Sequence, residues 1–159
     1  MSNMKALLRI IPQVGKVDLI TMRPERNVMP TIAEEAEVSI EDGLAGDRYA
    51  GRNKNRQITL IQAEHLVAVA SMLGKEKIDP LLTRRNLVVS GVNLLAFKDQ
   101  EFQIGDEVVL KMTGLCHPCS KMETNLGVGG YNAMRGHGGI TAKVVQGGKI
   151  RNGDAVKLK

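Results

Sequence analysis

Short apolar segments recur along this chain, and turn residues separate them at intervals too brief for long helices. Most of these segments are rich in valine, isoleucine or leucine and border glycine, proline or asparagine, a pattern typical of short strands. The predicted strands are residues 15–22, 38–40, 57–61, 86–90, both halves of 102–112 around Gly105-Asp106, 141–146 and 155–158, the last two joined by Gly147-Gly148. Because regular βαβ alternation is missing, we predict a mainly β (α+β) fold, a β-barrel with a few short helices.

The predicted helices are short and few. A helix is expected over residues 63–73 and ends at Gly74, and Asp79-Pro80 opens another. Residues 120–126 and 131–134 are expected to form short helical turns. The face of the first helix is predicted to consist of Leu66, Val67, Ala70 and Leu73.

Size, charge and composition narrow the possible functions. With 159 residues, the chain is predicted to be one domain over 1–159. The net charge of +5 favours anionic partners such as phosphates, although it is equally compatible with a role in solubility. Aromatic residues make up only 3% and tryptophan is missing, which argues against nucleic acid as a partner. No apolar run reaches the roughly 20 residues of a membrane span and no secretory signal is evident, so we expect a cytoplasmic protein without a membrane partner.

Cys116 and Cys119 are the only cysteines, and their segment is the strongest local signal. They are compatible with a redox CxxC pair, although a thioredoxin-like βαβ context is missing. They also provide two of the four ligands of a zinc site, with His117, His65 and His137 as the available histidines. A third interpretation is one reactive thiolate, Cys119, which would precede a short helix and lie near Lys121. Two inert buried cysteines remain the alternative.

Three further segments suggest an anion site. Arg84, Arg85 and Asn86 precede an apolar strand, and guanidinium groups suit phosphate, but a solvated basic turn is equally compatible. The glycine-rich loop 43–51 offers backbone N–H groups beside Asp47 and Arg48, or else an internal ion pair. A second glycine-rich segment, 127–140, includes Arg135 as a counter-charge and His137 as a possible proton donor.

These segments together resemble the MOSC domain, the C-terminal domain of molybdenum-cofactor sulfurases. The resemblance runs from Gly15 to Lys157 and depends on the order and spacing of several motifs. The motifs are Gly46-Asp47-Arg48, residues 57–61, residues 84–91, Ile104-Gly105-Asp106, residues 116–123, residues 134–140 and residues 150–154. The resemblance implies a barrel related to the pyruvate kinase β-barrel domain and a role with the molybdenum cofactor, molybdopterin.

The resemblance also implies roles for individual residues. Cys119 matches the cysteine that ligates molybdenum, so it is the predicted catalytic residue and metal ligand, whereas Cys116 lies where the family often has no cysteine. Arg84 and Asn86 match residues that would hold the phosphate of the anionic pterin. The predicted cofactor-binding residues are Arg84, Asn86, Arg48, Arg85, Lys121, Arg135 and His117. Soft thiolate for molybdenum and guanidinium for phosphate agree with the chemistry of these residues.

The resemblance leaves the activity open. The sulfurases carry a pyridoxal-phosphate domain for which this chain has no room, so we expect no desulfuration of cysteine by this chain alone. It is predicted to bind the cofactor, to carry sulfur on Cys119, or to reduce N-hydroxylated compounds. Those roles imply a cysteine desulfurase or an electron-donor protein as partner. A thiol-disulfide oxidoreductase using Cys116 and Cys119, or a basic nucleic-acid-binding module, are the alternatives.

Overall fold

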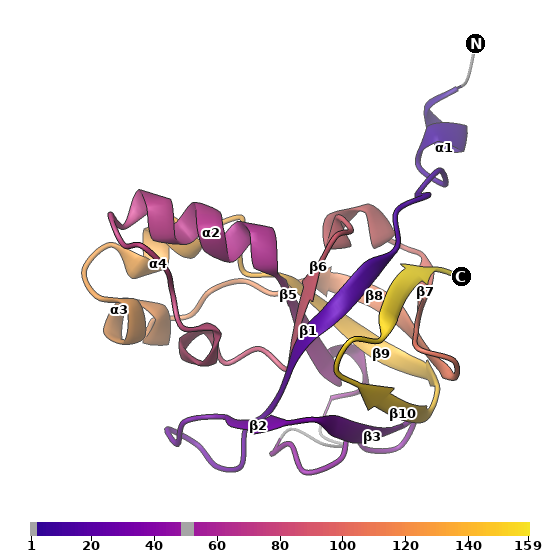
Figure 1. Ribbon diagram of the computed structural model, residues 1–159, viewed down its shortest axis with the longest axis horizontal. Coiled ribbons are helices and arrows are strands. Elements are labelled where there is room, and N and C mark those ends of the chain that lie inside the picture. Colours follow the sequence, from indigo (N-terminus) through magenta and orange to yellow (C-terminus); the bar gives the residue numbers. More distant parts are fainter. Residues whose placement is uncertain (1–2, 49–52) are drawn as a thin grey trace.

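The computed structural model describes residues 3–48 and 53–159, which form a β-barrel flanked on one side by helices (Figure 1). The barrel strands are β1 (Gly15–Met22), β5 (Ile58–Gln62), β6 (Leu87–Ser90), β7 (Glu101–Ile104), β8 (Val108–Leu115), β9 (Ile140–Gln146) and β11 (Ala155–Leu158). Within the described ranges these seven strands pair in the order β11-β7-β8-β9-β5-β6-β1, and β1 also pairs with β11. That last pairing closes the barrel, so the predicted mainly β fold with a barrel and short helices is confirmed.

Strand β1 closes the barrel because it has three neighbours along its length. Its start pairs with β11, its middle with β6 and its end with β2 (Thr31–Ala33). A register shift between Val17 and Leu19 lets the strand bend from one neighbour to the next. At the junction, a Cβ on Gly15 would lie 2.6 Å from the carbonyl oxygen of Ser90, so the strands meet as closely as glycine allows.

A small second sheet lies beside the barrel and corrects one prediction. It consists of β10 (Gly148–Arg151), β3 (Glu35–Ser39) and β4 (Gly43–Leu44). The predicted direct turn at Gly147-Gly148 is wrong, because β10 intervenes before β11. Strand β10 has little apolar pattern, and ion pairs between side chains support its pairing with β3. Lys149 lies opposite Glu37 and contacts its carboxylate at 3.6 Å and that of Glu35 at 3.3 Å.

Helices cover one outer side of the barrel. They are α2 (Ala63–Met72), the 3₁₀ turn η2 (Pro80–Thr83), α3 (Lys121–Leu126) and α4 (Gly130–Met134). The expected helix over 63–73 is present, but its predicted face is partly wrong. Leu66, Val69 and Ala70 are buried, whereas Val67 is 71% exposed. The buried stripe follows the spacing i, i+3, i+4, on which Val67 does not fall.

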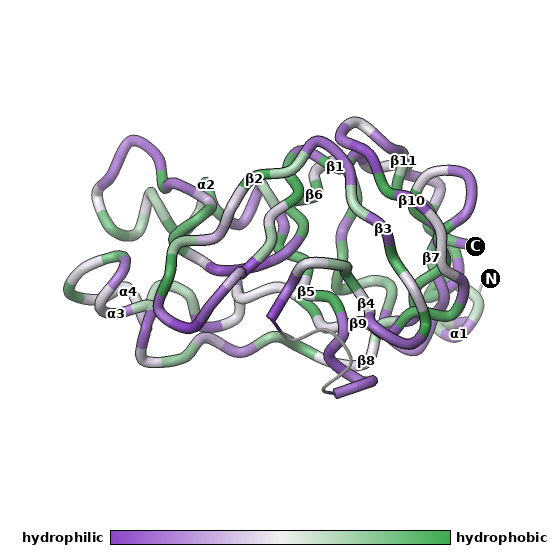
Figure 2. The backbone as a smooth tube through the Cα atoms, turned by 90° about the horizontal axis from the view of Figure 1, so that it is seen from below, coloured by the Kyte–Doolittle hydropathy of each residue, from purple (hydrophilic) through white to green (hydrophobic). Residues whose placement is uncertain are grey.

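Strands β5 and β6 are buried on both faces and so join two cores. Ile58, Leu60 and Leu87 point into the barrel interior, whereas Ile61 and Val88 pack against the helices. Successive side chains of a strand alternate between faces, which is why these short runs are apolar throughout. Figure 2 shows hydrophobic stretches along the barrel strands and hydrophilic stretches mainly in the loops. The pair β5–β6 is parallel, and the chain from α2 to η2 makes the required crossover.

Three short elements complete the described chain. They are α1 (Met4–Leu7), which extends away from the barrel, η1 (Lys54–Arg56), which leads into β5, and η3 (Leu94–Phe97). In residues 3–48 and 53–159, the helices are all too short or too polar to cross a membrane.

Candidate functional site

A cavity of about 490 Å³ lies on the outer side of the barrel over β5, where the helical layer begins. Thr59, on the outer face of β5, forms part of it. The segment before β6 approaches from one side, and the loop after β8 approaches from the other. The lining residues are Arg23, Asn53, Arg56, Thr59, Arg84, Arg85, Cys116, His117, Cys119, Lys121 and Met122.

The charge of this cavity is strongly one-sided. Four arginines and one lysine line it, and no carboxylate is present among the lining residues that the structure describes. A hollow that is lined by charges of one sign and partly by apolar groups concentrates the electrostatic field on a bound anion. Its volume suits a small organic ligand rather than a single inorganic ion. The cavity is therefore suited to an organic anion, and guanidinium groups favour phosphate.

The two cysteines occupy different environments in the loop between β8 and α3. Cys116 is 4% exposed, and its backbone N–H donates to the Gly139 carbonyl at 2.8 Å, which ties the loop to the start of β9. Cys119 is exposed, and its carbonyl accepts from the N–H of Met122 in the first turn of α3. Both thiols are free. The described residues include no cluster of three or more histidines, cysteines or carboxylates that could hold a metal, which leaves the zinc interpretation without support there.

The side chain of Arg85 donates hydrogen bonds to three of the segments that surround the cavity. Its Nε donates to the Gly138 carbonyl at 2.8 Å, and its Nη1 donates to the Thr83 carbonyl at 2.8 Å. Its Nη2 donates to the carbonyls of Cys116 and His117, at 3.5 and 3.4 Å. One buried side chain thus joins η2, the cysteine loop and the glycine-rich segment before β9.

All these acceptors are neutral, so the positive charge of Arg85 is not balanced by a carboxylate in the described part of the chain. Burial lowers the pKa of Arg85, and the nearby thiols of Cys116 and Cys119 oppose that shift. A buried cation without a carboxylate stabilises negative charge in its neighbourhood. This favours an anion, either a thiolate or a ligand, in the cavity.

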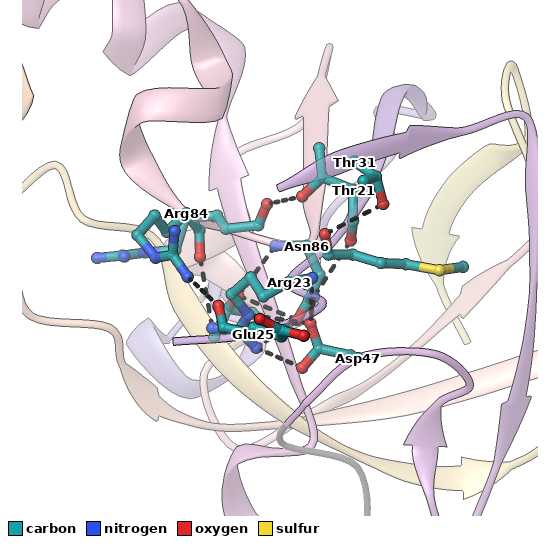
Figure 3. A network of polar contacts seen from close by, with 10 residues as sticks. Thr21, Arg23, Glu25, Thr31, Asp47, Arg84 and Asn86 are labelled. Carbon is teal, nitrogen blue, oxygen red and sulfur yellow. Dashed lines mark hydrogen bonds and ion pairs between the residues drawn. The ribbon is translucent and has the colours of Figure 1, made fainter. Parts of the chain in front are cut away.

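Arg23 lines the cavity and is held by a network of hydrogen bonds and an ion pair (Figure 3). Its Nε and Nη2 bind the two carboxylate oxygens of Asp47 at 3.0 and 2.9 Å, and both side chains are nearly buried. Asn86 completes the network: its Nδ2 donates to Asp47 at 3.1 Å, and its Oδ1 accepts from Arg23 at 3.2 Å. The same oxygen accepts from the backbone N–H of Thr59. Asn86 therefore lies behind the cavity wall, where it positions Arg23, and does not line the cavity itself.

Arg84 does line the cavity and adopts an unusual backbone conformation. It ends η2 with φ 56° and ψ 35°, the left-handed region that residues other than glycine seldom adopt. Its Nη1 donates to the carbonyl of Val28 at 2.5 Å, and its own carbonyl accepts from Arg23 at 3.4 Å. Such conformations cost about 1–3 kcal/mol and persist where surrounding contacts impose them. Arg84 thereby joins η2 to the loop after β1.

The remaining predicted site residues lie in three places. His117, Lys121 and Cys119 line the same cavity. Arg135 lies in an adjoining hollow of about 570 Å³, which shares His117 with the cavity. Arg48 does not contact the cavity. Its backbone N–H donates to the Arg23 carbonyl at 2.8 Å, and residues 49–51 of the predicted loop 43–51 lie outside the described residues.

Comparison with protein families identifies the fold and its family. The family model described as MOSC domain matches residues 35–157, which is most of the chain. The chain belongs to the MOSC domain family. Association with the molybdenum cofactor is a property of this family, not something that the match shows for this chain. Comparison with curated proteins gives no match.

Solved structures share the fold of this MOSC domain at low sequence identity. The YuaD protein from Bacillus subtilis matches with a TM-score of 0.82 and 17% identity, over 94% of this chain and 98% of that protein. YiiM from Geobacillus stearothermophilus matches with a TM-score of 0.74 and 15% identity, over 91% and 75% of the two chains. YiiM from Escherichia coli matches with a TM-score of 0.68 and 17% identity, over 91% and 69%.

Sequence reasoning missed several cavity residues of the MOSC domain: Arg23, Asn53, Arg56 and Thr59. The position of Arg56 relative to the predicted strands could have indicated that it belongs to the site. Arg56 lies just before the apolar strand 57–61, as Arg84 lies just before 86–90. In a parallel pair the strand starts lie at the same edge of the sheet, so basic residues before both strands are brought together.

His137, the candidate proton donor of the segment 127–140, lies outside the cavity of the MOSC domain. Its ring packs edge-to-face on His65 of α2, with centroids 5.1 Å apart, and its Nδ1 lies 3.1 Å from the Ala133 carbonyl. Burial, and secondarily the neighbouring His137, lower the pKa of His65, whereas Glu64 raises it. These contacts make the pair a packing element between α2 and the segment before β9.

Volume alone does not identify the site. A larger hollow of about 1000 Å³ lies between the arm that contains α1 and the region of η3 and β11. Its charged lining residues have both signs, and no cysteine lines it in the described part of the chain. The smaller cavity at Cys119 combines cations with a thiol, so its chemistry is the more specific.

Proposed function

We propose that this single MOSC domain binds the molybdenum cofactor in the cavity at Cys119. The observation that supports the proposal is the combination of Arg56, Arg84 and Lys121 with an exposed thiol, and without a carboxylate among the described lining residues. The cofactor is a pterin with a phosphate and a molybdenum centre bound through sulfur. It needs cations at one end and a soft ligand at the other, so the donor set of the cavity fits it.

The residues divide into ligand contacts and positioning residues. Arg84, Arg56 and Lys121 would contact the phosphate, since their side chains line the cavity. Asn86 would act through Arg23, which it positions together with Asp47. Arg85 would fix the position of the loop between β8 and α3, because it donates to the carbonyls of Cys116 and His117.

Cys119 would supply the thiolate, and Cys116 would not. Cys119 is exposed and lines the cavity, whereas Cys116 is buried. The bound cofactor would supply a molybdenum centre able to accept or donate oxygen or sulfur. Cys119 would be the soft ligand of that centre, since its exposed side chain lines the cavity beside the cationic groups. Free thiols also support the proposal that the protein works in the reducing cytoplasm.

A second candidate function is sulfur transfer, which the exposure of Cys119 favours. The Cys119 thiolate would attack the outer sulfur of a persulfide on a cysteine desulfurase. One S–S bond forms on Cys119 while the S–S bond of the donor breaks, and the donor cysteine leaves as a thiolate. The transfer is redox-neutral, so it needs no further oxidant or reductant.

A thiol-disulfide oxidoreductase and a nucleic-acid-binding module stay as alternatives with weaker support. In a CxxC oxidoreductase the attacking thiol must be accessible, and it is normally the first of the pair. Here the first cysteine, Cys116, is the buried one. If that reaction occurred, Cys116→Ser and Cys119→Ser would abolish it equally. A nucleic-acid-binding module would show binding that falls steeply with salt.

The test is to purify the protein anaerobically from a cofactor-producing host and to measure molybdenum by mass spectrometry and pterin by fluorescence. We expect stoichiometric molybdenum and pterin in the wild-type protein. Cys119→Ser should lose most of the molybdenum, and the matched variant Cys116→Ser should retain it. A mass gain of one sulfur atom, removed by reductant and without molybdenum, would indicate the sulfur carrier. A wild-type protein with neither metal, pterin nor added sulfur would refute both.

A further inference from the structure

A second basic hollow, of about 440 Å³, lies on the outer face of β8 and β9, beside the cavity. Arg56 lines both hollows, so they are neighbours. The other polar side chains in the second hollow that matter here are Lys111, Lys143, Thr113, Thr141 and Asp99. Among its lining residues that the structure describes, three cations outnumber one carboxylate, Asp99. Neither lysine forms an ion pair with any described residue.

The two lysines lie directly opposite each other on neighbouring strands. Lys111 of β8 pairs with Lys143 of β9 in the register. Like charges in directly opposed positions destabilise a sheet. Lysines on strands often protect an exposed sheet edge, but β8 and β9 each have neighbours on both sides in the closed barrel. Glu101 of β7 lies opposite Lys111 in the register but also contacts Lys159 at 3.5 Å, so it offsets only part of that repulsion, and a bound anion would relieve the rest.

A ladder of hydroxyl groups connects the hollow with the cavity. Thr59 of β5 lies opposite Thr141 of β9, and the Thr141 hydroxyl lies 2.8 Å from that of Thr113 on β8. The Thr113 hydroxyl also donates to the Asn55 carbonyl in η1. This contact fixes η1 against β8, so Arg56 is held at the boundary between the two hollows. The arrangement forms a row of hydroxyl groups across three strands, in which Thr59 and Thr141 are buried.

We propose that the hollow on β8 and β9 is a second anion subsite for an extended ligand of the nucleoside-diphosphate class. It takes the distal phosphate, which is the one farther from Cys119. The proposal rests on the proposed function, since the other phosphate of that ligand lies in the cavity at Cys119. Arg56 bridges the two phosphates, while Lys111 and Lys143 bind the distal one. The exposed side chain of Leu115 lines the same hollow and offers an apolar surface for a base. Such a ligand would be a nucleotide-extended form of the cofactor or a phosphorylated substrate.

The test uses the full chain from a host that makes no pterin, and calorimetric titration with ADP, AMP and orthophosphate at one ionic strength. We expect ADP to bind the wild-type protein more tightly than AMP or orthophosphate. The double variant Lys111→Gln/Lys143→Gln should weaken ADP binding about tenfold, as expected for two solvent-screened contacts. It should change orthophosphate binding less than about twofold, because that ion occupies the cavity.

A matched control removes the same charge elsewhere. Lys77→Gln/Lys157→Gln alters two exposed lysines that line neither hollow, and it should leave ADP binding unchanged. Equal weakening by both double variants, or no preference of the wild-type protein for ADP, would overturn the proposal. So would tighter binding of a longer oligoribonucleotide with the same loss in the lysine variant, since that indicates a nucleic-acid surface.

Two further measurements separate this proposal from the proposed function and identify the ligand source. A preference for ADP that the lysine variant loses, seen in a protein that never acquires molybdenum, would refute only the cofactor function. Acid treatment of protein from a cofactor-producing host then distinguishes the sources. Release of a nucleoside monophosphate assigns the distal phosphate to the cofactor, and retained ADP preference without such release assigns it to a substrate.

Discussion

Replacing Asp47 with asparagine should destabilise the protein far more than replacing a surface carboxylate. The Asp47 side chain is 1% exposed and accepts from the backbone N–H, Nε and Nη2 of Arg23, and from Nδ2 of Asn86. Asparagine keeps the shape but removes the charge, and its amide would have to replace one acceptor with a donor. Loss of one partner of a buried ion pair costs about 3–5 kcal/mol, because the other charge remains buried.

The expected change is large enough to measure by thermal and urea denaturation. For a chain of this size, about 3–5 kcal/mol lowers the melting temperature by roughly 6–20 °C. The matched control is Glu37→Gln. The Glu37 side chain is 66% exposed and contacts Lys149 at 3.6 Å, so its loss should cost less than about 1 kcal/mol.

A double variant separates stability from ligand binding. Arg23→Met/Asp47→Leu removes both charges, and Asn86 keeps the Thr21 carbonyl and the Thr59 N–H as partners. We expect this variant to recover most of the lost free energy of unfolding and still to bind orthophosphate more weakly, since Arg23 lines the cavity. If Asp47→Asn melts within experimental error of Glu37→Gln, the ion pair does not stabilise the fold and the reasoning is wrong.

Two further predictions concern the loop that holds Cys116 and the pH dependence of stability. A Cβ on Gly138 would lie 2.0 Å from the Cys116 carbonyl, so Gly138→Ala should cost at least about 1–3 kcal/mol. Gly114→Ala, whose Cβ would meet nothing closer than 3.7 Å, should cost less, and equal melting temperatures would contradict this. The lowered pKa of His65 means that the native state binds fewer protons than the unfolded state, so stability should fall as the pH drops below about 6.5. His65→Gln should flatten that decline in urea titrations, the exposed His117→Gln should not, and parallel curves for wild type and His65→Gln would count against it.

Local pattern was sufficient to predict most of the fold. Each of the predicted strands has a counterpart, because apolar β-branched runs between turn residues are buried on at least one face, in the barrel or, for 38–40, in the second sheet. The helix over 63–73 also follows from its own spacing. Strand β10 could not be predicted in the same way, because its pairing depends on Glu35 and Glu37, more than a hundred residues earlier. Val67 was misplaced because the direction of the core relative to α2 is a tertiary property.

The sequence by itself determined the kinds of groups available: one thiol segment, several arginines and glycine-rich segments, in the order typical of a MOSC domain. Only the tertiary structure decided which of them meet. Arg84 and Cys119 share a cavity, Asn86 lies behind it, and Arg23 joins them although nothing in its own segment indicated it. Barrel closure brings these distant segments to β5, and the register of the strands sets which side of β5 they reach. Register depends on the pairing of the whole barrel, so no single segment specifies it.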